Sequence, residues 1–233
     1  MKKTNESTAP QIEVLEARIA PAGLFSGVGS GQDLKVAKFL DADGDRVIVK
    51  LKGGGKNAVF DITLDGNVKN RANIESISVE NANENAKLRV TVKGRTAKFL
   101  ADGIEFPDTR TLRFTEIGSI AVDGSIKAIA LRGAAFDSVT VDGNLGSLST
   151  HLRRLQYIDL ELPGGLDPRD QFDLGDISVA GNLGAFSVRG RADFTNNLDG
   201  AITVGGNLGR IDAGSSNLNA SLDVSGSIGR GTR

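Results

Sequence analysis

The chain has no cysteine and no tryptophan, and only one histidine, one methionine and one tyrosine among its 233 residues. Without cysteine there is no disulfide, no thiolate metal site and no cysteine nucleophile. Aromatic residues make up only 5% of the chain, so a wide hydrophobic core would be poorly filled. No run of 18 or more apolar residues occurs, and the sequence therefore predicts no membrane span.

Charge of one sign is also lacking, because 28 basic and 29 acidic residues leave a net charge of −1. The charges are interspersed along the sequence. Proteins that track nucleic acid carry basic blocks or basic stripes rich in aromatic residues, and this sequence contains neither. We therefore expect no nucleic-acid partner.

Glycine is the residue that stands out, with 30 copies against five prolines. This is too many glycines for a helical bundle, and they do not follow the three-residue period of collagen. They more naturally mark frequent turns between short strands. The composition favours an all-β chain with a narrow core.

One short template recurs six times: apolar, any, apolar, any, Gly, Asn or Ser, apolar. The copies occupy residues 62–68, 120–126, 139–145, 177–183, 202–208 and 222–228. From Gly124 onward the glycines Gly143, Gly181, Gly206 and Gly226 follow at steps of 19, 38, 25 and 20 residues. The step of 38 suggests two steps of 19, with a missing rung at residues 158–162.

Each copy has the properties of one strand and one turn. Alternation with a period of two places both apolar positions on one face of a strand, and glycine then permits a turn that a Cβ would hinder. A unit of about 20 residues cannot bury its own apolar face, so successive units must stack. The sequence predicts a parallel β-helix (β-solenoid) with rungs of about 19–25 residues.

Stacking predicts that equivalent residues of successive units form two columns. The valines of the template should share one core, beside an aliphatic column after the turn. These residues are Val122, Val141, Val179, Val204 and Val224, and Ile126, Leu145, Leu183, Leu208 and Ile228. The Asn/Ser column should stack at the rung spacing of about 4.8 Å and form a hydrogen-bonded ladder.

The organisation along the chain follows from these patterns. Residues 1–23 read as a leader of an export type, 24–33 as a linker, 34–115 as a β-rich N-terminal capping region, and 116–233 as the clear rungs. Residues 151–175, which begin at the single histidine His151, read as an insertion.

The leader and the rungs resemble a known kind of protein. Residues 12–22, Ile-Glu-Val-Leu-Glu-Ala-Arg-Ile-Ala-Pro-Ala, resemble the N-terminal Leu-Glu-Pro-Arg motif of large surface or secreted proteins of planctomycete and verrucomicrobial bacteria, with Ala17 in place of proline. The Asp-rich residues 39–51 and the Gly-Asn-Leu-Gly rungs are also similar to such proteins. The resemblance implies an extracellular or cell-surface location and an architectural or adhesive role.

The strongest candidate for a binding site is the segment Asp41-Ala-Asp-Gly-Asp45. Alternate carboxylates around a glycine turn allow several oxygen atoms to converge on Ca²⁺, which gives Asp41, Asp43 and Asp45 as candidate ligands. The segment lacks the closing glutamate of an EF-hand, since Lys52 stands at that position. A polar turn between strands is the alternative. Asp123 and Asp142, in equivalent positions of consecutive rungs, would need a cation or good solvation.

Catalysis is poorly supported by the sequence. His151 is the only histidine and no Gly-x-Ser-x-Gly elbow occurs. Gly53-Gly-Gly55 before Lys56 lacks the ending of a phosphate loop and reads as a hairpin turn. We expect a non-enzymatic surface or secreted scaffold, adhesin-like, that contacts cell-envelope or extracellular polymers such as polysaccharide.

The alternative function is a carbohydrate-binding or polysaccharide-lyase-like β-helix. Such an enzyme needs acidic residues and a basic residue on one sheet face. The nearest approach to that arrangement is Asp159 and Glu161 beside Arg153 and Arg154.

Overall fold

The computed structural model describes residues 25–26, 34–41, 46–64, 74–93, 100–101, 104–105, 115–151, 173–189, 197–214 and 217–229. Within these ranges the chain forms 20 strands and no helix. None of the described segments is therefore a helix able to cross a membrane. The protein is all-β, as the sequence predicts.

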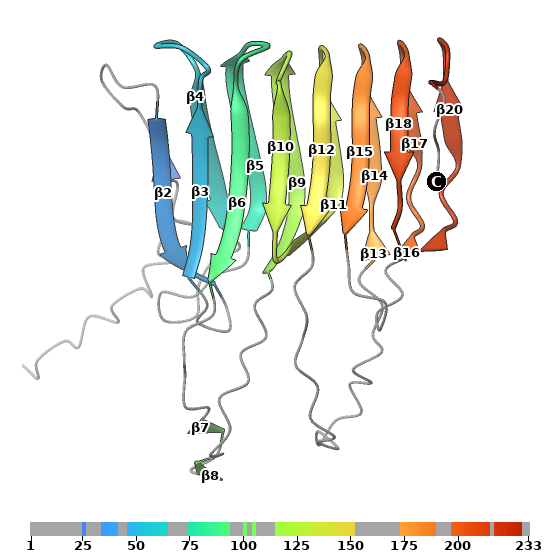
Figure 1. Cartoon of the computed structure of the whole chain (residues 1–233). Coiled ribbons are helices and arrows are strands. Elements are labelled where there is room, and N and C mark those ends of the chain that lie inside the picture. The colour runs from blue at the N-terminus through green and yellow to red at the C-terminus, as the bar shows by residue number, and fades with distance from the viewer. Residues whose placement is uncertain are drawn as a thin grey trace, which may run out of the picture.

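Two large sheets lie one behind the other, with the seven-stranded sheet facing the viewer in Figure 1. The eight-stranded sheet contains, in spatial order, β1 (Phe25–Ser26), β4 (Val59–Leu64), β5 (Ile74–Ala82), β9 (Thr115–Gly124), β11 (Ala134–Val141), β14 (Asp176–Val179), β17 (Ile202–Val204) and β20 (Leu222–Val224). The seven-stranded sheet contains β18 (Leu208–Asp212), β15 (Leu183–Arg189), β12 (Leu145–His151), β10 (Ala128–Arg132), β6 (Lys87–Lys93), β3 (Arg46–Lys52) and β2 (Leu34–Leu40).

Two small sheets complete the described strands. The three-stranded sheet pairs β13 (Asp173–Leu174), β16 (Asn197–Leu198) and β19 (Asn217–Leu218) in parallel. The two-stranded sheet pairs β7 (Leu100–Ala101) with β8 (Ile104–Glu105) in antiparallel fashion.

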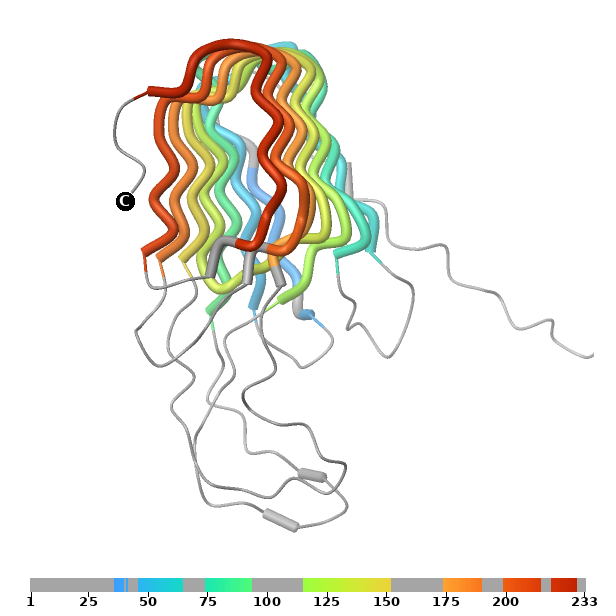
Figure 2. The backbone as a smooth tube through the Cα atoms, turned by 90° about the vertical axis from the view of Figure 1, so that its right-hand side faces the viewer, coloured from blue at the N-terminus to red at the C-terminus, as the bar shows by residue number. Residues whose placement is uncertain are grey.

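The chain alternates between the two large sheets. It passes from β5 to β6, from β9 to β10, from β11 to β12, from β14 to β15 and from β17 to β18, and each of these steps crosses from the eight-stranded to the seven-stranded sheet. Figure 2, turned by 90°, looks along the stack and shows the successive crossings superposed as arches along its upper edge. The apolar side chains of both sheets fill the narrow space between them.

Parallel pairing begins at β5 and β6, which pair in parallel with β9 and β10. Before that point the strands are antiparallel, with the orders β1-β4-β5 and β2-β3-β6. The first template copy belongs to this antiparallel part, because Ile62 of β4 pairs with Ile77 of β5. The strand that stacks in parallel under Ile120 is β5, through that same Ile77.

The parallel pairing predicted for residues 116–233 is confirmed for the described strands of both large sheets in this range, with the template residues in register. Val141 lies beside Val122 and Val179, and Val204 lies beside Val179 and Val224. The first four template valines are at most 2% exposed, as are Ile126, Leu145, Leu183 and Leu208. In the last described unit Val224 is half-buried and Ile228 is 52% exposed, because no further strand of the described chain pairs with β20.

The predicted missing rung is wrong. β11 pairs directly with β14, and β12 pairs directly with β15, so no strand lies between these units in either sheet. The step of 38 residues therefore belongs to one unit, and residues 152–172, which contain the predicted strand 158–162, lie outside the described residues. His151, predicted to open the insertion, is the last residue of β12.

The glycines at residues 53–55 do not form a hairpin turn. They follow β3 and precede β4, and these strands belong to different sheets, so the segment is an arch between the layers. Gly53 has φ of 78°, and an added Cβ would overlap the carbonyl oxygen of Asn85. This position needs glycine both for its left-handed backbone and for the close approach.

The predicted Asn/Ser ladder is confirmed by a continuous series of hydrogen bonds. The backbone N–H of Asn182 donates to Asn144 Oδ1 (2.8 Å), and the N–H of Asn207 donates to Asn182 Oδ1 (2.7 Å). Ser125 Oγ accepts from Asn144 N–H (3.0 Å) at one end, and Asn207 Oδ1 accepts from Ser227 N–H (2.9 Å) at the other. The ladder ties five consecutive units together along the stack.

The glycine column beside the ladder has a different cause from the predicted one. Of its described members only Gly124 has a positive φ, of 93°. At Gly143, Gly181, Gly206 and Gly226 an added Cβ would lie 2.5–2.6 Å from the side-chain oxygen of the preceding ladder residue. These four glycines are needed because the neighbouring unit approaches too closely for any side chain.

Candidate binding faces

The outer face of the seven-stranded sheet is cationic. Outward positions alternate with buried ones along each strand, as the burial patterns of β3 and β6 show. The exposed cationic side chains on its strands are Lys38, Arg46, Lys50, Lys52, Lys87, Arg89, Lys93, Arg132, Arg189 and Arg210. Among the described side chains of these seven strands, the single acidic one is Asp212. We call this surface the cationic face.

The densest part of the cationic face lies on the antiparallel strands β3 and β6. Their register places three pairs of like charges directly opposite each other: Arg46 and Lys93, Lys50 and Arg89, and Lys52 and Lys87. Like charges in directly opposed positions destabilise a sheet, whereas a pair of opposite charges would stabilise it. The fold therefore maintains this positive charge against its own stability.

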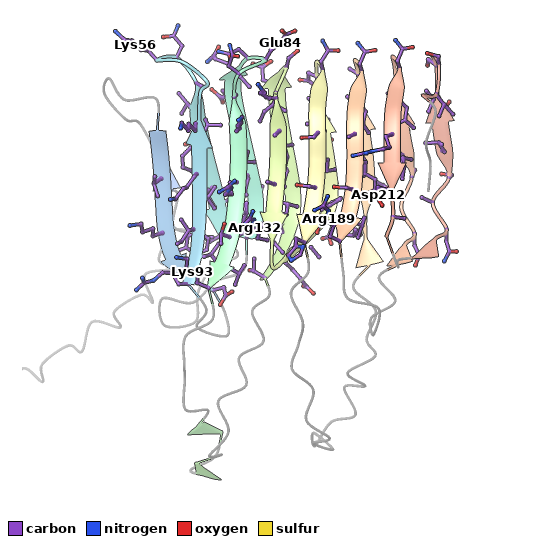
Figure 3. The ribbon with its side chains drawn as sticks, in the orientation of Figure 1. Lys56, Glu84, Lys93, Arg132, Arg189 and Asp212 are labelled. Carbon is purple, nitrogen blue, oxygen red and sulfur yellow. The ribbon has the colours of Figure 1, made fainter. Side chains whose placement is uncertain are left out.

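A second row, of two arginines with a histidine between them, crosses the parallel part of the same sheet. His151 of β12 lies between Arg132 of β10 and Arg189 of β15, and each is the register partner of the next. Figure 3 shows the labelled Lys93, Arg132 and Arg189 on the sheet that faces the viewer. Lys56 and Glu84, in contrast, lie at the upper edge of the sheets, where the chain crosses from one sheet to the other.

The eight-stranded sheet carries the opposite charge. No lysine or arginine occurs in any of its eight strands. Its described strands and the residues directly after them expose Glu75, Glu80, Glu116, Asp123, Asp137, Asp142, Asp176 and Asp223. We call this surface the acidic face. The fold thus sorts a nearly neutral chain into two broad faces of opposite sign.

Asp123 and Asp142 are brought side by side, as the sequence predicts. Val122 and Val141 are register partners, and the N–H of Asp142 donates to the carbonyl of Val122 (3.0 Å). Both aspartates are exposed. Water therefore reaches both carboxylates. This fits a solvated column, which the sequence offered as the alternative to a bound cation.

The predicted calcium ligands are only partly placed. Asp41 follows β2 and is buried, with 1% of its surface exposed. Asp43 and Asp45 lie outside the described residues, as do Arg153, Arg154, Asp159 and Glu161 of the lyase alternative. Within the described ranges no group of three or more histidine, cysteine, aspartate or glutamate side chains is arranged to hold a metal ion.

Sequence reasoning missed both charged faces because it read the charges as interspersed. The signal was their position relative to the turn glycine. Asp123 and Asp142 stand before Gly124 and Gly143, in or directly after strands of the eight-stranded sheet, whereas Arg132 and similar cations stand after the turn. Sorting the charges by side of the turn, instead of by distance along the chain, would have revealed the two faces.

Comparison with known proteins adds no relative, because no protein-family model, curated protein or solved structure matches this chain.

Proposed function

We propose that the protein is a parallel β-solenoid that serves as a non-enzymatic scaffold at the cell surface or outside the cell. The in-register parallel pairing from β5 to β20 and from β6 to β18 supports the solenoid architecture, with each unit entering one sheet and leaving through the other. The side-chain ladder and the backbone bonds between units favour a stiff body, as a scaffold requires.

The observation that carries the binding role is the set of like-charge pairs on β3 and β6. A purely structural sheet gains stability from opposite charges at such positions. Three cationic pairs on one pair of strands are best explained by an anionic partner that neutralises them. The scaffold accordingly presents its cationic face to an anionic component of the envelope or the extracellular medium.

Binding to an acidic polysaccharide is the form of the alternative function that the cationic face favours. Exposed lysine and arginine side chains spread over several strands match a polymer with repeated carboxylates or sulfates. The lyase form of this alternative would additionally need the residues of 152–172, which lie outside the described ranges.

The location of the chain tests the scaffold proposal directly. We expect the protein in the envelope fraction or the medium of its source cells, because the leader-like residues 1–23 resemble an export segment. A protein confined to the cytosol contradicts the proposal.

The binding role is tested with Arg89→Glu, which converts the Lys50–Arg89 pair into a pair of opposite charges. We expect this variant to be at least as stable as the native chain and to sediment poorly with isolated envelopes. Lys56→Glu makes the same change in net charge at the arch and should sediment as the native chain does. If Arg89→Glu sediments equally well, the cationic face does not carry the interaction.

A further inference from the structure

The two charged faces are built by the same units, so they have a common period along the stack. Strands in both sheets follow one another at about 4.8 Å, because one turn of the chain contributes one strand to each sheet. Two copies lying side by side with parallel stack axes could therefore keep all their units level with each other.

The opposite charges also occur at the same levels of the stack. The unit of β5 and β6 carries Glu75 and Glu80 on one side and Lys87, Arg89 and Lys93 on the other. The next unit, β9 and β10, carries Glu116 and Asp123 opposite Arg132.

The same match continues further along the stack. Asp137 and Asp142 accompany His151 in the unit of β11 and β12, and Asp176 accompanies Arg189 in the unit of β14 and β15. A copy displaced sideways, with no shift along the stack, would place anionic groups opposite cationic ones at the levels of β6, β10 and β15, and opposite the imidazole of His151 at the level of β12.

We propose that copies of this chain associate side by side, with the cationic face of one on the acidic face of the next. This inference rests on the proposed function, since it names a second copy as the anionic partner of the cationic face. The near-zero net charge leaves little overall repulsion between copies. Because the two contact surfaces differ, the interface is heterologous. A row of copies therefore keeps a free cationic face at one end and a free acidic face at the other. The product is an open row, which suits a layer in the envelope.

The purified full chain tests this by light scattering and sedimentation. We expect its average mass to increase with concentration at 20 mM salt, where charges are felt over about 20 Å, and to fall to the monomer at 0.5 M salt, where they are screened beyond about 4 Å. Arg89→Glu should weaken the association at least tenfold, and Lys56→Glu should leave it unchanged. Circular dichroism of each variant checks that the β structure is retained.

Zero-length coupling of carboxylates to amines identifies the surfaces in contact. In a mixture of ¹⁵N-labelled and unlabelled chains, we expect intermolecular links from Lys87 or Lys93 to Glu75 or Glu80, which lie at the same level of the stack. A chain that remains monomeric at low salt and high concentration overturns the inference, and so does association that is insensitive to Arg89→Glu. If that monomer binds polygalacturonate through the cationic face, the partner is a polysaccharide and the proposed function still stands.

Discussion

The contact between Gly206 and Asn182 gives a sharp test of how the stack is held together. An alanine at position 206 would place its Cβ 2.6 Å from Asn182 Oδ1. That oxygen accepts a hydrogen bond from the N–H of Asn207 at 2.7 Å. The new methyl group would therefore displace the acceptor that binds the next unit. Overpacking of this kind costs about 1–3 kcal/mol, and disturbance of the hydrogen bond adds to it.

The matching deletion, Asn182→Ala, removes that bond and a second one in which Asn182 Nδ2 donates to Asn144 Oδ1 (3.1 Å). Each net contribution is about 0.5–1.5 kcal/mol, and both bonds are exposed, so we expect a loss of about 1–2 kcal/mol. In the double variant the closest clashing atom is gone, the tight 3.0 Å contacts of the new Cβ with the backbone C and O of Gly181 remain, and the shared bond is lost only once. The two effects should therefore fall short of their sum by about 1 kcal/mol or more.

Urea unfolding of the native chain, both single variants and the double variant measures this coupling. Thr203→Ala, on the exposed side of β17 in the same unit as Gly206, is the control and should change the free energy of unfolding by less than about 0.5 kcal/mol. Additivity within about 0.3–0.5 kcal/mol would refute the reasoning. It would mean that glycine occupies this column for a reason unrelated to the ladder.

Two further predictions concern the core and calcium. Val179→Asp places a carboxylate at a site that is 1% exposed and should lower the free energy of unfolding by several kcal/mol. Ser178→Asp, on the exposed side of the same strand, should not lower it to this extent. Equal melting temperatures of the two variants would contradict the assigned core. If Asp41, Asp43 and Asp45 bind Ca²⁺, then Ca²⁺ at ten times its Kd should stabilise the fold by about 1.4 kcal/mol. A chelator should reverse this stabilisation, and the Asp43→Ala variant should not show it. A melting temperature that does not change when chelator is added would identify the three aspartates as a polar turn.

Strand positions and core columns could be predicted from the sequence because they depend on local alternation. The apolar residues of the template occur at period two, and this period alone places Val141 and Val179 on the inner face of their strands. The ladder could be predicted because Asn recurs at one template position. Both predictions start from a position that recurs in every unit, and in-register stacking brings the equivalent positions together.

Strand direction and the number of rungs could not be obtained in the same way. Alternation is identical in a parallel and an antiparallel strand, so nothing local distinguishes Ile62, which pairs antiparallel with β5, from Ile120, which pairs with β5 in parallel. The spacing between Gly143 and Gly181 likewise does not determine the number of rungs. A step of 38 residues fits two short rungs or one rung with an excursion, and only the direct pairing of β11 with β14 decides between them.

The cause of the glycine column shows a further limit, since sequence reasoning supplied the right residue with the wrong reason. Glycine is usually explained by a backbone conformation that other residues avoid, and at Gly124 that explanation holds. At Gly206 the backbone is open to other residues, and the oxygen of Asn182 occupies the space instead. That steric demand comes from a neighbour 24 positions earlier in the chain, so it exists only after stacking.

The charge distribution follows the same logic and has the larger consequence for function. A net charge of −1 and interspersed charges indicate, for a compact chain, a mixed surface without directional interaction. In a stack of identical turns, however, any bias between the two sides of the turn is added once per unit. In the sequence, Asp142 before a turn and Arg132 after one are single charges. In the structure, Asp142 belongs to a row of acidic residues on one face, and Arg132 belongs to the cations of the opposite face. A modest preference within one unit thus becomes two extended surfaces of opposite sign, and the repeat itself makes them commensurate between copies.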